Sequence, residues 1–193
     1  MTKVAAILAT GTPEDRAIAV ALAEAGWDIA IGTLEKSQEQ EFATASIANE
    51  VWSIGRQNFS SVVASTDPTA LSAFAAETAD RLGRCDLLVV RAVGAFIAPA
   101  EEISADEWEP AITAGITVPF LATHAFAPII ERDGGGHVFY LPPSNAAGSI
   151  AGAVTTAARK ELAARLSIAF AHHRLQVMEL PTDDPAALMA VLP

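Results

Sequence analysis

The chain alternates short apolar runs with longer amphipathic segments six times, and this alternation restricts its fold more than any other feature. The runs, each predicted to be a β-strand, are residues 4–9, 29–31, 62–64, 86–90, 138–141 and 175–180. Strands that are apolar on both faces are typical of a parallel sheet covered by helices on both sides. We therefore expect a doubly wound, Rossmann-like α/β fold with about six parallel strands, formed by a single domain over residues 1–193.

Helix start signals open the segments between these runs. Thr12 is suited to cap a helix that begins at Pro13, and Glu14 and Asp15 place two acids in its first turn. Pro119 is expected to kink the longest helix, because proline has no backbone N–H to donate. The other helices are expected over residues 37–56, 67–83, 104–131 (the longest) and 153–171, with a short one at 185–191.

Charge and composition exclude several classes of function. The chain has 12 basic and 23 acidic residues, a net charge of −11 that repels nucleic acid and anionic membranes. A single Cys cannot form an internal disulfide, which indicates a reducing compartment. No apolar run reaches the roughly 18 residues of a membrane span, and the N-terminal run is too short for a signal peptide. We expect a soluble, cytoplasmic protein without a metal site, since the adjacent His172 and His173 point in different directions on a helix.

Ligands of doubly wound folds bind beyond the carboxyl ends of the strands. The segments to inspect for function are therefore residues 10–16, 33–36, 64–67, 90–96, 141–144 and 180–184. Arg91 ends the fourth run, where its guanidinium is suited either to an anionic ligand or to a carboxylate of the protein surface.

Stretches along nearly the whole chain resemble the short-chain dehydrogenase/reductase family, in the family's order. They are residues 9–11 (Ala-Thr-Gly), 16–26, 80–89, 101–108, 119–123 and 135–141. The resemblance implies a Rossmann fold and NAD(P)-dependent oxidoreductase chemistry. It also implies a seventh strand and a substrate lid, which are expected to be missing because the chain stops at Pro193 after its sixth run.

The family's cofactor loop, Thr-Gly-x3-Gly-x-Gly, is only partly present. Gly11 remains, but Thr-Pro-Glu-Asp-Arg at residues 12–16 replaces the rest and places two acids where a phosphate would sit. Binding of NAD(P) is therefore expected to be weak or lost. Arg16 is either a phosphate ligand or, as we expect, a solvated helix residue. The positions that the resemblance assigns to the cofactor are Gly11, Thr12, Arg16, Arg91 and Lys160.

The family's catalytic Asn, Ser and Tyr are also replaced. Gly115 stands at the Asn position, Pro143 at the Ser position and Thr156 at the Tyr position, and only Lys160 is retained. An aliphatic hydroxyl is too weak an acid to take over from a phenol. Ser144 lies one residue from the Ser position, so the remaining candidate catalytic residues are Lys160, Thr156 and Ser144.

A register shift does not repair this set. Thr155 and Arg159 have the same spacing one residue earlier, but they supply no phenol either. The only Tyr of the chain is Tyr140, within the fifth run, where we expect a core aromatic with one hydrogen bond.

Three functions remain open. The first is a catalytically inactive family member that acts as a binding or partner subunit, either with an intact paralogue or as a two-fold homodimer. The homodimer would form through the helices over residues 104–131 and 153–171, the family's fifth and sixth, where Ala153, Ala157, Ala158, Ala163 and Ala164 allow close approach.

The second is an active oxidoreductase with a rearranged site for a small carbonyl or alcohol. Arg16 and Arg91 would hold the phosphates, Lys160 the ribose, and Ser144 or Thr156 the substrate oxygen. The third is a small-ligand binder that uses the vacated crevice without a dinucleotide.

Overall fold

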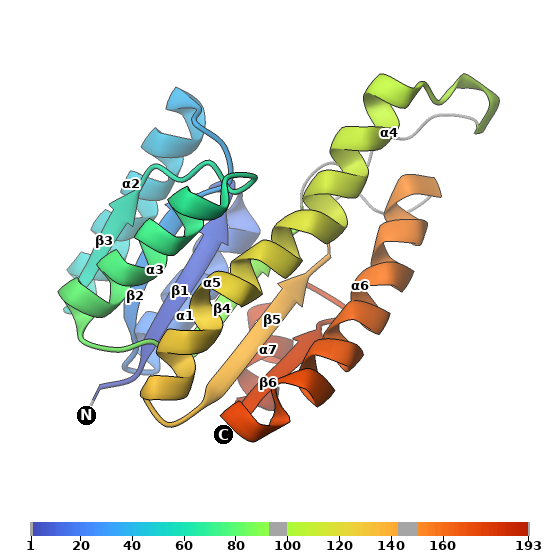
Figure 1. Cartoon of the computed structure of the whole chain (residues 1–193). Helices are drawn as coiled ribbons and strands as arrows, with labels where there is room; N and C mark the ends of the chain where they lie inside the picture. Colours follow the sequence, from blue (N-terminus) through green and yellow to red (C-terminus); the bar gives the residue numbers. More distant parts are fainter. Residues whose placement is uncertain (1, 93–99, 143–149, 193) are drawn as a thin grey trace.

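A parallel sheet of six strands runs through the protein, with helices on both of its faces (Figure 1). The computed structural model describes residues 2–92, 100–142 and 150–192. The strands follow the order β3-β2-β1-β4-β5-β6, and every neighbouring pair is parallel. Their bounds are β1 Val4–Ala9, β2 Asp28–Thr33, β3 Asn58–Ser61, β4 Leu87–Arg91, β5 Gly136–Leu141 and β6 Leu175–Glu179. The chain order reverses between β1 and β4, so the predicted doubly wound fold is confirmed.

Two layers of helices bury the two faces of the sheet. One layer consists of α1 (Pro13–Glu24), α2 (Gln38–Ser53) and α7 (Pro185–Val191), and the other of α3 (Pro68–Leu82), α5 (Val118–Arg132) and α6 (Ile150–Ala169). All six residues of β1 are buried, on both faces of the sheet, which explains why this strand is apolar throughout. The shorter helical segments are Ala100–Glu102, α4 (Ala105–Ile112), the π-helical turn Thr113–Thr117 and Ala171–His173.

The helix caps follow the sequence signals. The Thr12 side chain accepts a hydrogen bond from the Asp15 N–H, and Pro13 is the first residue of α1. Asp67 caps α3 by accepting from the Thr69 N–H at 2.8 Å. These side chains satisfy backbone donors that have no partner within the helix.

The third strand is not where the sequence pattern predicted it. Residues 62–64 were expected to form it, but the strand is Asn58–Ser61, which pairs with β2. An edge strand exposes one side to water and therefore tolerates the polar residues that mask it in the sequence. Val63 instead lies beyond the strand, where its N–H and C=O both bond the Thr33 hydroxyl, at 2.8 and 2.9 Å.

The longest helix changes its winding where a proline removes a hydrogen bond. α4 and α5 are joined by a π-helical turn, Thr113–Thr117, directly before Pro119. Pro119 cannot donate to the carbonyl of Gly115 four residues earlier, so the wider turn replaces the regular ladder at this point. The disturbance expected at Pro119 is thus a π-turn on its N-terminal side.

The stretch Ala105–Arg132 is long and apolar enough, by length and composition, to be a candidate membrane span, which the expectation of no such segment missed. It is the one such helix among the described residues. Its second half behaves as a core helix, because Phe126 and Ile130 are fully buried against α3 and the sheet. The apolar character of this half is therefore explained by packing inside the domain.

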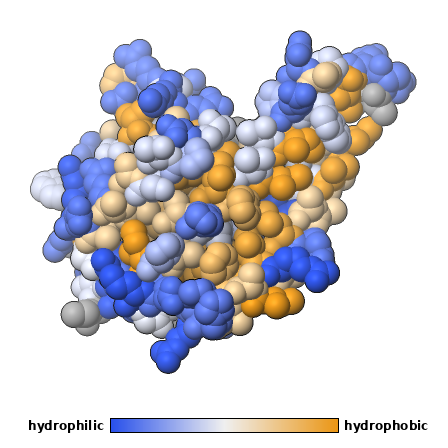
Figure 2. All heavy atoms as spheres, in the orientation of Figure 1, coloured by the Kyte–Doolittle hydropathy of each residue, from blue (hydrophilic) through white to orange (hydrophobic). Residues whose placement is uncertain are grey.

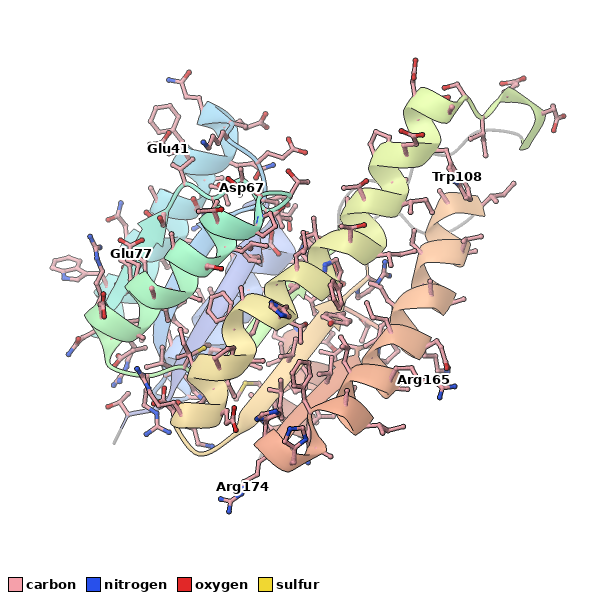
Figure 3. All side chains as sticks on the ribbon, in the orientation of Figure 1. Glu41, Asp67, Glu77, Trp108, Arg165 and Arg174 are labelled. Atoms are coloured by element: carbon pink, nitrogen blue, oxygen red, sulfur yellow. The ribbon has the colours of Figure 1, made fainter. Side chains whose placement is uncertain are left out.

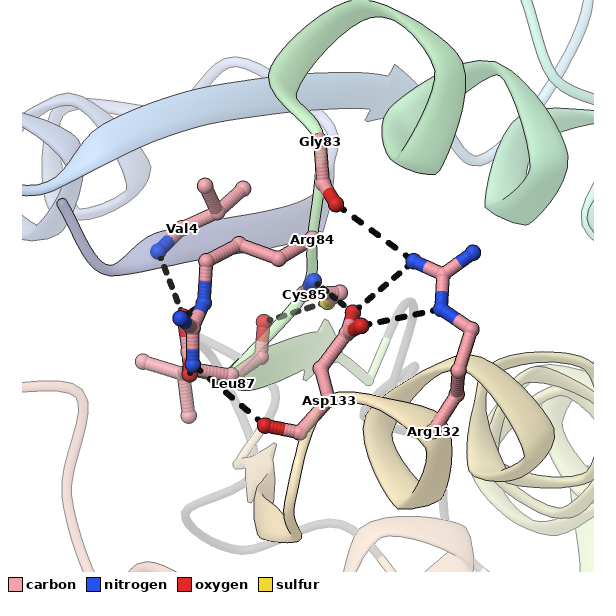
Figure 4. Close-up of polar contacts among 8 residues, drawn as sticks. Val4, Gly83, Arg84, Cys85, Leu87, Arg132 and Asp133 are labelled. Carbon is pink, nitrogen blue, oxygen red and sulfur yellow. Dashed lines mark hydrogen bonds and ion pairs between the residues drawn. The ribbon is translucent and has the colours of Figure 1, made fainter. Parts of the chain in front are cut away.

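Cys85 lies in a buried junction between β4 and the end of α5 (Figure 4). Its N–H donates to Asp133 Oδ2 at 3.0 Å, and its thiol lies 3.4 Å from the carbonyl oxygen of Leu87. Burial raises the pKa of the Cys85 thiol from 9.0 to about 12. A thiolate is therefore strongly disfavoured in the folded state.

We predict that a thiol reagent at pH 8 labels native Cys85 only when the domain unfolds. The variant Glu39→Cys, at an exposed position of α2, provides the control: its introduced thiol should react at once and Cys85 slowly. Above pH 9 the unfolded thiol ionises while the folded thiol stays protonated to about 12, so stability should fall with rising pH relative to Cys85→Ala. Labelling of the wild type as fast as the introduced thiol of Glu39→Cys would contradict the prediction.

Candidate functional site

The turn after β1 wraps its backbone around a carboxylate of its own chain. The N–H groups of Thr10, Gly11 and Thr12 donate to Asp15 Oδ2 at 3.0, 3.0 and 3.2 Å, and the Thr10 hydroxyl lies 3.3 Å from the same oxygen. Gly11 has φ +88°, a left-handed conformation that lets successive N–H groups converge. Asp15 is only 1% exposed, although it stands in the first turn of a helix. The loop at the start of α1 is thus a filled anion site.

Arg91 balances this buried carboxylate. Its side chain at the end of β4 is 2% exposed, and its Nε is ion-paired with Asp15 Oδ1. Its Nη1 donates to Asp183 Oδ2 at 3.1 Å and to the carbonyl of Pro142 at 3.3 Å. One guanidinium therefore connects the segments that follow β1, β5 and β6. Of the two roles open to Arg91, the structure shows pairing with carboxylates, in the interior rather than at the surface.

The sequence assigned NAD(P) phosphates to this loop, and the residues present do not fit them. A pyrophosphate at a helix N-terminus needs converging backbone N–H groups and a surplus of positive charge. Here Asp15 accepts from the three N–H groups of Thr10, Gly11 and Thr12 and is itself paired with Arg91. A phosphate at the same place would meet a buried carboxylate. Of the two acids predicted at this helix end, Asp15 therefore lies inside the loop.

Gly11 serves helix packing. A Cβ on Gly11 would lie 2.3 Å from the Cβ of Ala43 in α2, so α2 rests directly against the loop. In a cofactor loop the absent side chain lets the backbone approach a pyrophosphate. In this chain the space beside Gly11 contains a helix.

Arg16 points from α1 toward α2. Its guanidinium is ion-paired with Glu50, and Nη2 donates to the Ser46 hydroxyl at 3.2 Å. The side chains of the ion pair are 40% and 39% exposed. Arg16 is partly exposed, as expected of a solvated helix residue, but it is ion-paired with Glu50. The structure does not bring its side chain to the predicted phosphate position.

A second buried ion pair lies between α6 and the end of β6. Arg159, fully buried, donates from Nη2 to Glu179 Oε1 at 3.0 Å and to the Thr156 hydroxyl at 3.0 Å. Its Nη1 lies 3.4 Å from the carbonyl oxygen of Gly115 in the π-turn. Burial lowers the pKa of Arg159 and raises that of Glu179, while their mutual attraction opposes both shifts.

Two of the predicted catalytic positions, Thr156 and Lys160, lie one helical turn apart on α6. Thr156 is half-buried beside Arg159, and Lys160 is exposed. The inward residues are Thr155 and Arg159, one position earlier, and Thr155 packs where a side chain on Gly115 would be. Ser144 and Pro143 lie outside the described residues.

The single tyrosine is a core residue, as predicted, with two hydrogen-bond partners rather than one. The Tyr140 hydroxyl is 2.6 Å from Thr123 Oγ1 and 3.2 Å from the carbonyl oxygen of Pro119. Tyr140 is fully buried, and burial raises the pKa of its phenol further above 10. It faces α5, within the core of that layer.

A cavity of about 650 Å³ lies next to the loop that follows β2. Leu34, Ala64, Pro110, Ala114 and Val118 contribute apolar walls, and Glu35, Lys36, Asp106 and Glu109 are the charged residues of the lining. The cavity combines segments after β2 and β3 with α4 and the π-turn. Among the described residues, it coincides with the parts of the predicted crevice at residues 33–36 and 64–67.

The fold is of the Rossmann-like α/β class, and the N–H groups of the loop after β1 are bonded to the carboxylate of Asp15. A family model described as short chain dehydrogenase matches residues 3–174, so the chain belongs to the short-chain dehydrogenase family. The predicted family is therefore confirmed, and it is a family of NAD(P)-dependent oxidoreductases.

Solved structures share this fold at low identity. A short-chain type dehydrogenase/reductase from Mycobacterium marinum is 21% identical with a TM-score of 0.81, over 92% of this chain and 72% of that one. A hydroxysteroid dehydrogenase from Escherichia coli is 22% identical with a TM-score of 0.78, over 92% and 69%. A metagenomic short-chain oxidoreductase in complex with NADP is 20% identical with a TM-score of 0.82, over 98% and 89%.

Sequence reasoning missed the partners that close the site. Asp183, Glu179 and Ala43 lie far along the chain from the residues that they contact. A buried Arg at a strand end does require a carboxylate nearby, but the sequence alone offers many acids to choose from.

We predict that removing one member of the Arg159–Glu179 pair is costly and that removing both is less so. Arg159→Met should lower the free energy of unfolding by about 3–5 kcal/mol, because it leaves the Glu179 charge buried without a partner. The penalty should shrink at low pH, where Glu179 takes up a proton, and the double variant with Glu179→Gln should recover part of it. Denaturant unfolding measures the free energy of unfolding of each variant.

The control lies on the same helix. Arg165 projects from the outer side of α6 (Figure 3) and pairs with Glu161, with side chains 75% and 64% exposed. Arg165→Met should cost less than about 0.5 kcal/mol. Equal costs for the two arginines would show that the Arg159 pair is not buried as described.

Proposed function

We propose that this protein is a cytoplasmic, catalytically inactive member of its family that acts as a binding or partner subunit. The observation that carries the proposal is the position of Tyr140, the only phenol in the chain, which is buried and hydrogen-bonded in the core. Carbonyl reduction needs an acid that can give a proton to the substrate oxygen. Thr156, at the predicted Tyr position, has an aliphatic hydroxyl that is far too weak an acid for this role.

The charges near the vacated site support the same proposal. Arg91 and Arg159 are the buried arginines of the described residues, and both are paired with carboxylates. In both residues an internal carboxylate already offsets the positive charge that would attract an anionic ligand. The alternative of an active enzyme with a rearranged site assigned the phosphates to Arg16 and Arg91, and both side chains are engaged with carboxylates.

The surface over α5 and α6 is the best candidate for a subunit contact. Apolar residues gather on this side of the molecule in Figure 2, and the exposed ones on these helices are Phe120, Ile150, Val154 and Ile168. We propose a two-fold homodimer, or a heteromer with an intact paralogue, in which four helices pack together. Ala153, Ala157 and Ala164 are exposed and suit such a contact, whereas Ala163, expected there, is buried against the core.

A second candidate function, a small-ligand binder without a dinucleotide, is favoured by the cavity of about 650 Å³. Its apolar walls suit a flat neutral ring, and Glu35 offers a carboxylate to hydroxyl groups at the rim. Adenosine is a suitable probe, because it has a flat neutral ring and hydroxyl groups but no phosphate.

We predict that NADH and NADPH at millimolar concentration leave the melting temperature of the wild type unchanged. A cofactor at one hundred times its dissociation constant would add about 2.7 kcal/mol, which a thermal melt detects readily. A rise that disappears in Lys160→Ala would support the active-enzyme alternative and contradict the proposal. A rise with adenosine alone would favour the second candidate.

We predict sedimentation at about 40 kDa, twice the 20.1 kDa of the chain, when no paralogue is present. Val154→Glu on α6 should shift the protein toward the monomer, because it buries a charge in the proposed contact. Trp52→Glu is the matched control, since Trp52 is 74% exposed on α2 in the other helix layer. Dissociation by Trp52→Glu but not by Val154→Glu would place the contact elsewhere.

A further inference from the structure

We propose that Asp15 is an internal anion that takes the place of a ligand phosphate, so that this chain completes its own binding loop. The proposal concerns the loop after β1 and stands whether or not the protein has a partner subunit. In this proposal Asp15 keeps a phosphate out of the loop, in addition to the changed glycines.

The donors around Asp15 form the pattern that proteins use for phosphate. Three consecutive N–H groups, from Thr10 to Thr12, converge on one carboxylate oxygen at 3.0–3.2 Å. Such a concave run of N–H groups at the start of a helix attracts anions through both hydrogen bonds and the helix dipole. The loop has therefore kept its preference for an anion, and the chain supplies one from the third residue of α1.

The protein also supplies the positive charge that balances Asp15. Arg91 is buried, and its Nε faces the Asp15 oxygen that the loop does not bind. Without Asp15, Arg91 would retain Asp183, whose side chain is 24% exposed, and would lose its fully buried partner. A buried guanidinium that loses such a partner favours any small anion that can reach the same position.

The packing of α2 sets the size of that anion. Ala43 occupies the space beside Gly11, and Arg16 ties α1 to α2 through Glu50. A formate ion has the same carboxylate group as Asp15, and inorganic phosphate is larger but much smaller than a dinucleotide. We therefore expect small anions, and not the complete dinucleotide, to fill the gap when Asp15 is shortened.

The test is chemical rescue of Asp15→Ala, read as melting temperature. The variant should melt well below the wild type, and sodium formate or phosphate should raise its melting temperature saturably by about 5–10 °C compared with NaCl of equal ionic strength. The wild type should show no such saturable rise. Asp67→Ala is the matched control, because it removes another helix-capping aspartate, one that is exposed at the start of α3.

Each outcome decides the proposal. Saturable rescue of Asp15→Ala, absent in the wild type and in Asp67→Ala, supports it. Equal anion effects on all three proteins, or none on Asp15→Ala, overturn it. Stabilisation of Asp15→Ala by NADH but not of the wild type would support the role of Asp15 and contradict the size limit that we assign to α2.

If Asp15→Ala does not fold in plain buffer, its refolding yield with and without formate replaces the melt. A soluble, folded fraction that depends on formate supports the proposal. Asp15→Asn then serves as the second variant, because it keeps an acceptor oxygen and loses the charge. If formate stabilises neither Asp15→Ala nor Asp15→Asn, the proposal is overturned. Carbonyl reductase activity of the wild type would refute the proposed function and leave this result unchanged.

Discussion

The ion pair between Arg91 and Asp15 is the interaction on which the carboxyl edge of the sheet depends. A charge at the end of a buried central strand is tolerated only with a partner and further hydrogen bonds. Asp15 provides the partner, and Asp183 and the Pro142 carbonyl provide further contacts. The same pair explains why Asp15 is buried at a helix start and why the loop amides face inward. One compensated charge thus organises the edge where relatives of this fold bind their ligands.

Pro119 is linked through the π-turn to the buried ion pair of Arg159 and Glu179. The proline removes one donor from the long helix, a π-turn precedes it, and the Gly115 carbonyl in that turn lies near Arg159. Arg159 in turn contacts Glu179 and Thr156. The two buried arginines lie at different places along this edge, yet each satisfies its charge with a carboxylate from a segment distant in the sequence. Each of the two guanidinium groups is therefore paired with at least one carboxylate of the chain itself.

The fold could be predicted from the sequence because apolar runs and caps are local signals. β1 and the caps of α1 and α3 are confirmed, whereas the third strand was misplaced because Ser60 and Ser61 hide an edge strand. The site was harder to predict, because the contacts between its side chains depend on the three-dimensional fold. The sequence indicated that Asp15 would repel a phosphate. It could not show that the carboxylate turns into the loop and pairs with Arg91, since that depends on the β1–β4 adjacency.

The contacts of Arg91 also bear on the order of folding. They join residues 76 and 92 positions apart in the sequence, whereas the capping bonds of α1 span three to five. Contacts between such distant segments form late, because the intervening chain must first be ordered. Interactions made after the transition state act mainly on the unfolding rate. We therefore expect the contacts of Arg91 to affect the unfolding rate of the domain more than its folding rate.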